Sequence, residues 1–302
     1  MGSRPPPLIV ALSSLSARKL AVSVAVVAIV LAALAVPLWR ASPALYATEE
    51  TRIEPHAYTA EDPVACVAGA RPGPSGESAS EETPAGTRYM VKTPANYDAT
   101  RAHPLIVVFA PHGVNRLLSE RFVGLTRAAT RAGFVIAYAD SRPLDTKVLE
   151  DLGRIPAMVA SRWCIDERRV FFTGHSDGGT AATALVVLRQ SIPPVAIAPS
   201  AAGFRGADLA AYACPPPMAV MVQHSGNDEL FPGFGREAAA WWAACNGCRG
   251  TPEPRSDGCL AYPSCSAGGI TLYCQSAGRH IDWPRKNERL LAFFESAGRG
   301  FR

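Results

Sequence analysis

The feature that most constrains the fold is a regular alternation of short apolar runs with longer amphipathic segments, which begins at residue 88. The strand-length runs are residues 88–93, 105–110, 134–138, 170–173, 195–198, 218–223 and 270–274. The helix-length segments are residues 119–132, 147–162, 180–190, 236–245 and 286–296. Several of the short runs are apolar throughout, which is typical of parallel strands buried on both faces. Because strand–helix alternation leads to parallel pairing through right-handed crossovers, residues 88–302 are predicted to form one α/β domain with a mostly parallel central sheet flanked by helices.

Composition excludes two classes of protein. Hydrophobic types make up 48% of the 302 residues and charged types 19%, so the chain lacks the low hydrophobicity and high charge of a disordered protein. The net charge is only +4, and the basic residues form no long run, which argues against a nucleic-acid partner.

The N-terminal region carries a membrane signal. Residues 20–38 contain no charged side chain, and only Ser23 and Pro37 interrupt their apolar character. At about 1.5 Å per residue this run can cross a bilayer, and it is longer than the roughly 7–15 apolar residues of a cleaved signal peptide. We therefore interpret residues 1–19 as a cytoplasmic basic segment and residues 20–40 as a transmembrane anchor.

This interpretation places the rest of the chain in the periplasm or outside the cell, anchored to the inner membrane through the N-terminal helix. Secretion after signal cleavage near residues 41–47 is one alternative, and a buried helix of a soluble core is another. Residues 41–87 are weakly patterned and rich in Pro, Gly and Ser from residue 71 onward, so we predict a tether and a surface loop.

An even number of cysteines agrees with an exported domain. The eight are Cys66, Cys164, Cys214, Cys245, Cys248, Cys259, Cys265 and Cys274. We predict that they form disulfides, whose pairing the sequence leaves open. Five of them lie between residues 245 and 274, so complete pairing needs at least one bond from this cluster to another cysteine. The alternative is a zinc site at Cys245-x-x-Cys248, but the next pair is too widely spaced for a usual zinc ribbon.

The most informative motif lies between an apolar strand and a helix. It reads Gly174-x-Ser176-x-Gly178, which is the nucleophile-elbow pattern of α/β-hydrolases in its required context. In such an elbow the serine hydroxyl is raised clear of the sheet on a strained turn. The alternative is a glycine-rich strand–helix turn without chemistry.

A serine nucleophile needs a base and an acid, which in this fold follow it in the order Ser, Asp or Glu, His. Asp228 follows the strand at 218–223, and His280 follows the strand at 270–274. Both should therefore reach the carboxyl edge of the sheet beside Ser176. We predict Ser176, Asp228 and His280 as a catalytic triad.

Other residues could fill these roles. Glu229 and Asp257 are alternative acids, whereas Asp282 lies too close to His280 in sequence to be the first choice. His224 ends a strand, where a packed, hydrogen-bonded histidine is more common than a second base.

Negative charge that develops on a substrate oxygen requires preorganised donors. One should be the backbone N–H of Asp177, which follows the nucleophile. The second should be the N–H of Gly113 or Val114, in the loop after the strand at 105–110. The alternative for this loop is a plain turn.

With these motifs the chain resembles the polyhydroxybutyrate depolymerase and feruloyl esterase family of exported α/β-hydrolases. The matching segments, from about Cys66 onward, include residues 88–98, 163–170, 224–232 and 241–265 together with the strand before His280. The resemblance implies an α/β-hydrolase fold and a carboxylesterase whose triad is Ser176, Asp228 and His280. We also assign His112, His175 and Trp283 to the substrate pocket, with packing beneath the nucleophile as the alternative for His175.

Three positions depart from the family pattern. Pro111 stands where the family often has Leu before His-Gly, His175 precedes the serine in place of an aliphatic or aromatic residue, and one extra residue separates His280 from Trp283. None of these changes removes a catalytic group, but each puts substrate preference in doubt.

The sequence therefore predicts an extracytoplasmic serine carboxylesterase that needs no cofactor and no metal and is a monomer. Candidate substrates are hydroxyalkanoate oligomers or polymer, feruloyl or acetyl sugar esters, and short aryl esters. The alternative is a membrane-tethered binding protein on a catalytically inactive hydrolase fold.

Overall fold

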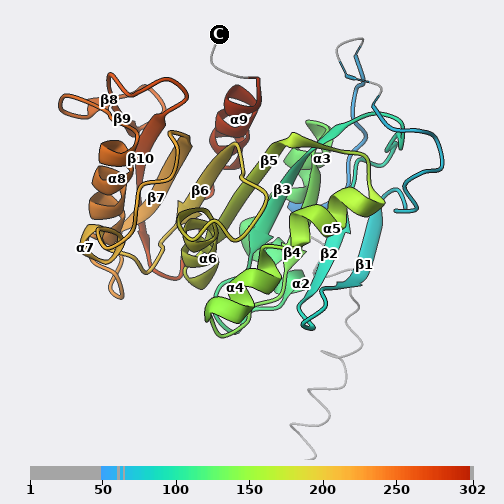
Figure 1. Cartoon of the computed structure of the whole chain (residues 1–302), viewed down its shortest axis with the longest axis horizontal. Helices are drawn as coiled ribbons and strands as arrows, with labels where there is room; N and C mark the ends of the chain where they lie inside the picture. Colours follow the sequence, from blue (N-terminus) through green and yellow to red (C-terminus); the bar gives the residue numbers. More distant parts are fainter. Residues whose placement is uncertain (1–48, 60–61, 64, 300–302) are drawn as a thin grey trace, which may run out of the picture. The chain divides into compact units, whose positions relative to one another are not determined.

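The computed structural model describes residues 49–59, 62–63 and 65–299, all of which belong to the compact unit Thr48–Arg302. Within them one ten-stranded sheet has the order β1-β2-β4-β3-β5-β6-β7-β10-β9-β8 (Figure 1). The strands are β1 Glu77–Glu82, β2 Arg88–Lys92, β3 His103–Phe109, β4 Val135–Ala139, β5 Ile165–His175, β6 Ala196–Ser200, β7 Ala219–Asn227, β8 Glu253–Pro254, β9 Cys259–Tyr262 and β10 Ile270–Arg279. The helices are η2 Glu49–Thr51, α2 Arg116–Val123, α3 Thr126–Arg131, α4 Thr146–Leu152, α5 Ile155–Arg162, α6 Asp177–Val187, α7 Gly206–Leu209, α8 Phe234–Cys245 and α9 Asn287–Gly298.

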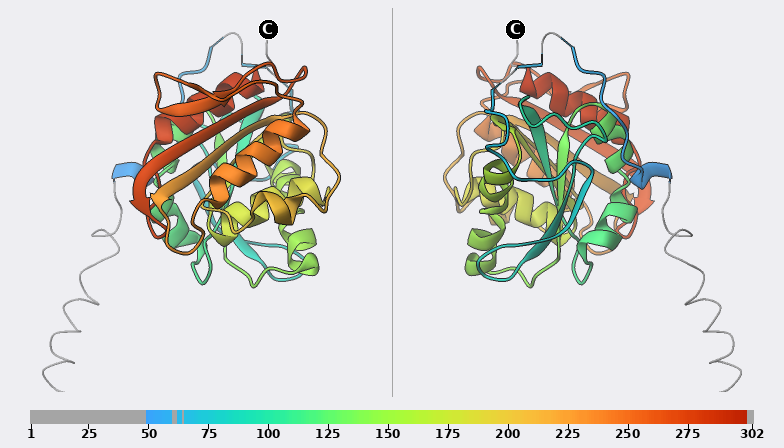
Figure 2. Two further views of the ribbon diagram at one scale, coloured as in Figure 1. Left: turned by 90° about the vertical axis from the view of Figure 1, so that its left-hand side faces the viewer. Right: turned by 90° about the vertical axis from the view of Figure 1, so that its right-hand side faces the viewer.

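The centre of the sheet is parallel, as the continuous apolar runs predict. Parallel pairing joins β4 to β3 and continues through β5, β6 and β7 to β10, and antiparallel strands close both edges. Figure 2 views the molecule from these two edges, the β8 side and the β1 side. The fold is thus a mostly parallel α/β sandwich, which confirms the predicted architecture of the body.

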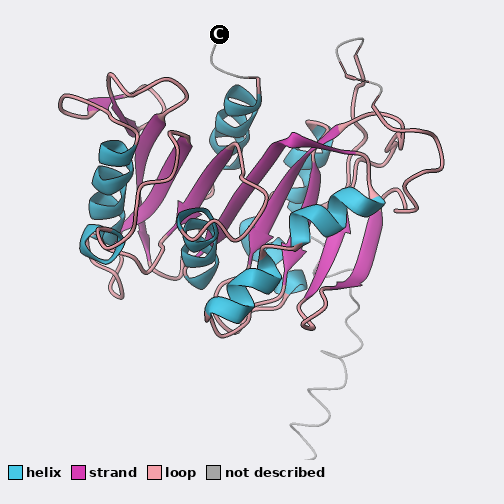
Figure 3. Ribbon diagram, viewed as in Figure 1, coloured by secondary structure: helices cyan, strands magenta, loops and turns pink. Residues whose placement is uncertain are grey.

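Both faces of the sheet are covered by helices (Figure 3). Side chains of α4, α5, α6 and α8 pack on one face, and those of α2, α3 and α9 pack on the other. Strand β3 is consequently buried along its whole length. Two apolar layers, rather than one, explain why its sequence does not alternate between polar and apolar residues.

The prediction of a tether and surface loop over residues 41–87 is wrong for residues 77–82. They form β1, an edge strand that pairs antiparallel with β2. Apolar periodicity could not reveal this strand, because most of its side chains are exposed and the one that is buried belongs to Glu81. The carboxylate of Glu81 pairs with Arg162, so backbone pairing and an ion pair hold the strand rather than an apolar face.

Four disulfides link all eight cysteines. The pairs are Cys66–Cys164, Cys214–Cys245, Cys248–Cys265 and Cys259–Cys274. The bond from Cys245 to Cys214 is the link out of the C-terminal cluster that the odd number of its cysteines requires. Because Cys245 and Cys248 bond to different partners, the structure favours disulfides over the alternative zinc site. Disulfides of this number indicate a protein that matures outside the cytoplasm.

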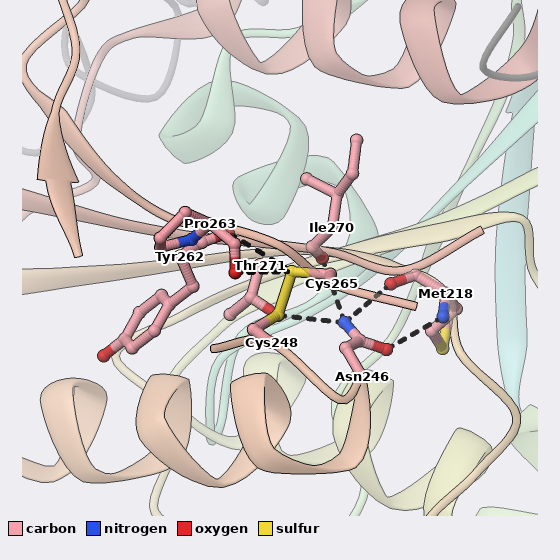
Figure 4. Close-up of a disulfide and its surroundings, with 8 residues drawn as sticks. All are labelled: Met218, Asn246, Cys248, Tyr262, Pro263, Cys265, Ile270 and Thr271. Atoms are coloured by element: carbon pink, nitrogen blue, oxygen red, sulfur yellow. Dashed lines mark hydrogen bonds between the residues drawn. A yellow bond between two sulfur atoms is a disulfide. The ribbon is translucent and has the colours of Figure 1, made fainter. Parts of the chain in front are cut away.

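The Cys248–Cys265 bond lies beside a buried asparagine that joins three elements (Figure 4). The side-chain Nδ2 of Asn246 donates to the carbonyl oxygens of Met218 and Ile270 at 2.9 and 3.1 Å, and its Oδ1 accepts from the Met218 amide at 3.0 Å. The end of α8 is thereby fixed to the starts of β7 and β10. Asn246 thus adds side-chain bonds at the starts of β7 and β10, the two paired strands that precede Asp228 and His280.

We expect no free thiol in the native protein. Thiol titration of the unfolded, unreduced chain should detect no cysteine, and reduction should expose all eight. The Cys66–Cys164 bond closes the longest loop, with a sequence separation of 98, so its removal should cost about 2–5 kcal/mol of unfolding free energy. Detection of most thiols before reduction, or of stoichiometric zinc, would contradict the disulfide assignment.

Among the residues that the structure describes, no helix has the length and apolar character needed to cross a membrane. The apolar run at residues 20–38, on which the predicted anchor rests, lies outside the described residues.

Candidate active site

Ser176 occupies a sharp turn between β5 and α6. Its backbone angles are φ 55° and ψ −119°, a conformation that L residues rarely adopt. The two motif glycines make the turn possible, since a Cβ at Gly174 or Gly178 would lie 2.5 or 2.0 Å from the carbonyl oxygen of Phe109 on β3. The structure therefore contains the predicted elbow, in which strand β3 leaves no room for a side chain at positions 174 and 178.

The structure brings Ser176, His280 and Asp228 into one hydrogen-bonded row. The Nε2 atom of His280 lies 2.9 Å from Ser176 Oγ, and its Nδ1 atom lies 2.8 Å from Asp228 Oδ2. A carboxylate can only accept, so Nδ1 carries the proton and Nε2 is free to accept one from the serine hydroxyl. This arrangement is that of a nucleophile, a base and an orienting acid.

Asp228 is held ionised within a buried site. Its burial opposes ionisation, but hydrogen bonds from His280 and from the Phe231 amide, with the nearby His280 and His224 rings, lower its pKa below the ordinary value. Its second oxygen, Oδ1, accepts from the amides of Leu230 and Phe231 at 3.0 and 2.8 Å. The backbone amides of its own loop therefore fix one oxygen of the aspartate, and the other oxygen contacts the histidine.

The alternative acids do not contact the His280 ring. Glu229 is exposed and accepts from the backbone amide of His280 at 3.1 Å. Asp282 accepts from the Arg279 amide at 2.8 Å, and Asp257 pairs with Arg255. Geometry therefore favours Asp228 over all three.

His224 is a buried histidine beside the acid. Its Nε2 lies 2.9 Å from the carbonyl oxygen of Phe231 and 3.6 Å from Asp228 Oδ2, and burial lowers its pKa. Its Nε2 atom is engaged by the Phe231 carbonyl, as in a packed, hydrogen-bonded histidine. The structure thus agrees with the expectation that His224 is not the base.

The two loop amides predicted to face the substrate oxygen are already paired. The amide of Gly113 donates to Ser141 Oγ at 3.0 Å, and that of Val114 donates to the Pro111 carbonyl at 3.1 Å. These two amides fit the alternative of a plain turn, because the bond from Val114 to Pro111 closes a tight turn after β3. The structure therefore does not support Gly113 or Val114 as oxyanion donors.

The N–H of Asp177 is differently placed. Asp177 is the first residue of α6, so its amide has no acceptor within the helix. Its carboxylate lies 2.9 Å from Nδ1 of His112, whose side chain is exposed. His112 and Asp177 thus connect the loop after β3 to the elbow at the edge of the candidate site.

Two residues assigned to the substrate pocket are buried instead. His175 is only 2% exposed and Trp283 only 5%. Trp283 borders a pocket of about 460 Å³, but none of Ser176, Asp228 and His280 lines that pocket. The indole N–H of Trp283 donates to Asn287 Oδ1 at 2.9 Å, while its ring lies against His175 with centroids 6.2 Å apart. The alternative for His175, packing beneath the nucleophile, is the observed one.

Exposed apolar side chains adjoin the candidate site in sequence. Leu230 follows the acid and Ile281 follows the base, and each is 60% exposed. Leu117 and Leu118, just after the loop that holds His112, are also exposed. By contrast, the residues that line a cavity of about 690 Å³ include Pro193, Pro194 and residues 215–217, and none of Ser176, Asp228 and His280 borders it. The candidate active site is therefore identified by its hydrogen-bonded Ser176, His280 and Asp228, and not by the size of a cavity.

The buried His175 should make folding stability depend on pH. Burial lowers its pKa to about 4, well below the 6.5 of an exposed histidine, so the unfolded chain binds the proton more readily. Stability from this residue is complete above pH 6.5 and is lost as the pH falls toward 4. Denaturant unfolding should show a loss of about 2 kcal/mol between pH 7 and 5, to which His224 adds with the same sign.

The variant His175→Gln, which has no titrating side chain, is the control for this measurement. It should show a clearly shallower fall over the same pH interval. Equal pH dependence in the variant and the wild type would rule out His175 as the source.

No family model matches the sequence. Solved structures with a similar fold include an acetyl xylan esterase from Aspergillus awamori, at 14% identity and a TM-score of 0.58, with 74% of this chain and 99% of that chain covered. A truncated carbohydrate esterase from gut microbiota is similar at 11% identity and a TM-score of 0.55, covering 74% and 97%. A thermophilic esterase from the planctomycete Thermogutta terrifontis, with butyrate bound, is similar at 14% identity and a TM-score of 0.51, covering 74% and 92%.

These likenesses concern the fold. Together with the parallel sheet and the strained serine turn, they show that the body of the chain has the α/β-hydrolase fold. The narrower resemblance to polyhydroxybutyrate depolymerases and feruloyl esterases remains an interpretation of the sequence motifs.

Proposed function

We propose that the protein is a serine carboxylesterase that acts outside the cytoplasm. The observation that carries this proposal is the row Ser176–His280–Asp228, with distances of 2.9 and 2.8 Å, on a strained elbow. A binding protein would not require all three groups in this order and contact. The similar solved structures named as esterases support the same class of reaction.

The geometry suggests the following mechanism. Ser176 Oγ attacks the ester carbonyl carbon while its proton passes to Nε2 of His280, and a tetrahedral oxyanion forms. The oxyanion collapses, the bond to the alcohol oxygen breaks, and His280 returns the proton to that alkoxide. Water then attacks the acyl-enzyme by the same route, which releases the acid and restores the serine hydroxyl. Asp228 orients the ring of His280 throughout and stabilises the imidazolium that forms whenever Nε2 holds the transferred proton.

For the oxyanion we propose the N–H of Asp177 as one donor. As the second we propose the N–H of His112, because the next two amides of that loop bind Ser141 and Pro111. The contact between the His112 and Asp177 side chains, at 2.9 Å, would keep the two backbone amides close enough to bind the same oxyanion.

The substrate class is an ester that binds at an open surface. The exposed Leu117, Leu118, Leu230 and Ile281 lie close in sequence to the proposed machinery, and we propose that they contact an apolar part of the ester. Hydroxyalkanoate oligomers or polymer, feruloyl or acetyl sugar esters, and aryl esters all remain candidates. We further propose that residues 20–40 anchor the domain to the inner membrane, with secretion after cleavage as the alternative.

Labelling with a fluorophosphonate tests the proposal. The wild type should incorporate one label at Ser176 and Ser176→Ala none, since only an activated serine reacts. A panel of hydroxyalkanoate, feruloyl, acetyl-sugar and aryl esters would then rank substrates. An unlabelled, inactive wild type that still binds esters would favour the inactive binding protein instead.

A further inference from the structure

His175 is a buried polar residue in direct contact with the loop that carries His280. It is the last residue of β5, immediately before Ser176, and is 2% exposed. Its Nε2 atom lies 2.6 Å from the backbone carbonyl oxygen of His280. Its Nδ1 atom lies 3.0 Å from Ser200 Oγ at the end of β6.

These contacts define the protonation of the ring. A carbonyl oxygen can only accept, so Nε2 of His175 carries the proton and donates to His280. The neutral ring then accepts at Nδ1 from the Ser200 hydroxyl. Ser200 also receives the amide of Ser176 on its carbonyl oxygen, at 2.9 Å. One imidazole therefore joins the serine turn, the end of β6 and the backbone of the proposed base.

The ring of His175 is also held by its neighbours. Phe122 contacts it edge-on at a centroid distance of 5.1 Å, and Trp283 lies at 6.2 Å. The backbone of His280 has a second anchor, because its amide donates to Glu229 at 3.1 Å, but Glu229 is an exposed side chain. The buried anchor on the carbonyl side is His175.

We propose that His175 is a positioning residue for the base: its N–H fixes the His280 backbone so that the ring spans Ser176 and Asp228. This inference rests on the proposed esterase function. The ring of His280 must meet two partners 2.9 and 2.8 Å away at once, so a small backbone shift would lengthen one of these bonds. Loss of such alignment lowers the rate of the chemical step rather than substrate binding.

The test compares substitutions of His175 by leucine and glutamine. His175→Leu removes the donor and should lower kcat about 10- to 100-fold, with KM changed less than about twofold. His175→Gln keeps an N–H at the end of a side chain of similar reach, so kcat should recover to within about fivefold of the wild type. The rate of fluorophosphonate labelling should follow kcat in both variants, while the final stoichiometry stays at one label.

Thr173→Val is the matched control. Thr173 is buried on the same strand, and its hydroxyl donates to the backbone carbonyl of Ala198 at 2.7 Å, so the variant loses a comparable bond away from His280. Its kcat per folded molecule should match that of the wild type. If His175→Leu does not fold, Ser200→Ala decides instead, because it removes only the partner of Nδ1 and should lower kcat about three- to tenfold.

Two results would overturn the positioning role. One is a folded His175→Leu variant with wild-type kcat, and the other is a loss in Thr173→Val as large as in His175→Leu. If the leucine variant does not fold, an unchanged kcat in Ser200→Ala would likewise overturn the positioning role. Failure of the esterase proposal is distinguishable, because it would appear in the wild type itself as absent labelling and turnover.

Discussion

Ser176→Ala and His280→Ala are each expected to lower kcat by roughly 10⁶, and the double variant should be scarcely worse than either. The serine and the histidine act as one unit, since Ser176 Oγ gives its proton to the Nε2 atom that lies 2.9 Å away. Removal of the base leaves an unactivated hydroxyl, and removal of the hydroxyl leaves the base without its partner. Steady-state kinetics on the best ester of the panel would measure these losses.

Folding must be checked in the same samples. Ser176→Ala removes only a hydroxyl, and circular dichroism and the unfolding midpoint should therefore match those of the wild type. Substantial turnover by a folded Ser176→Ala variant would refute the proposed nucleophile. Additive losses in the double variant would argue against joint action of the two residues.

Asp228→Asn is expected to lower kcat by about 10⁴ without unfolding the protein. The amide oxygen of the asparagine can still accept from the Leu230 and Phe231 amides, so the loop should keep its shape. Its N–H₂ group would instead face Nδ1 of His280 and donate to it. The ring would then carry its proton on Nε2, where it cannot accept the proton of Ser176.

Asp282→Asn is the matched control for the acid. Asp282 lies close to His280 in sequence, but its carboxylate accepts from the Arg279 amide, and the structure shows no bond from it to the imidazole. An asparagine oxygen can take over that bond, so kcat should stay within about twofold of the wild type. Should Asp282→Asn be the crippling change while Asp228→Asn stays active, the acid assignment is wrong, although the α/β-hydrolase fold is unaffected.

Several features of this protein could be predicted from local sequence alone. The parallel sheet follows from apolar runs such as residues 105–110, because burial on both faces removes the alternation of a half-exposed strand. The serine turn follows from Gly174 and Gly178, because no side chain fits against β3 at those positions. Ser176, Asp228 and His280 each follow a parallel strand in the sequence, which predicts that all three lie at the same edge of the sheet.

Other features depend on contacts between distant segments, which periodicity does not encode. Strand β1 has an exposed, polar sequence and exists because its backbone pairs with β2. The sequence left many disulfide pairings open, and tertiary contacts select among them. Cys259 and Cys274 are cross-strand partners in β9 and β10, and Cys245 at the end of α8 bonds to Cys214.

The details of the candidate site were also decided by the tertiary structure. The motif after β3 placed Gly113 and Val114 correctly in a loop, but their amides bind Ser141 and Pro111, partners that no local pattern reveals. His175 adjoins the serine in sequence, yet it binds the backbone of His280, 105 residues away. Sequence by itself determined which chemical groups reach the carboxyl edge of the sheet, because each of these groups follows a parallel strand directly in the chain. Which donors and acceptors pair there was decided by the folded chain, because each hydrogen bond depends on placing two distant backbones within about 3 Å of each other.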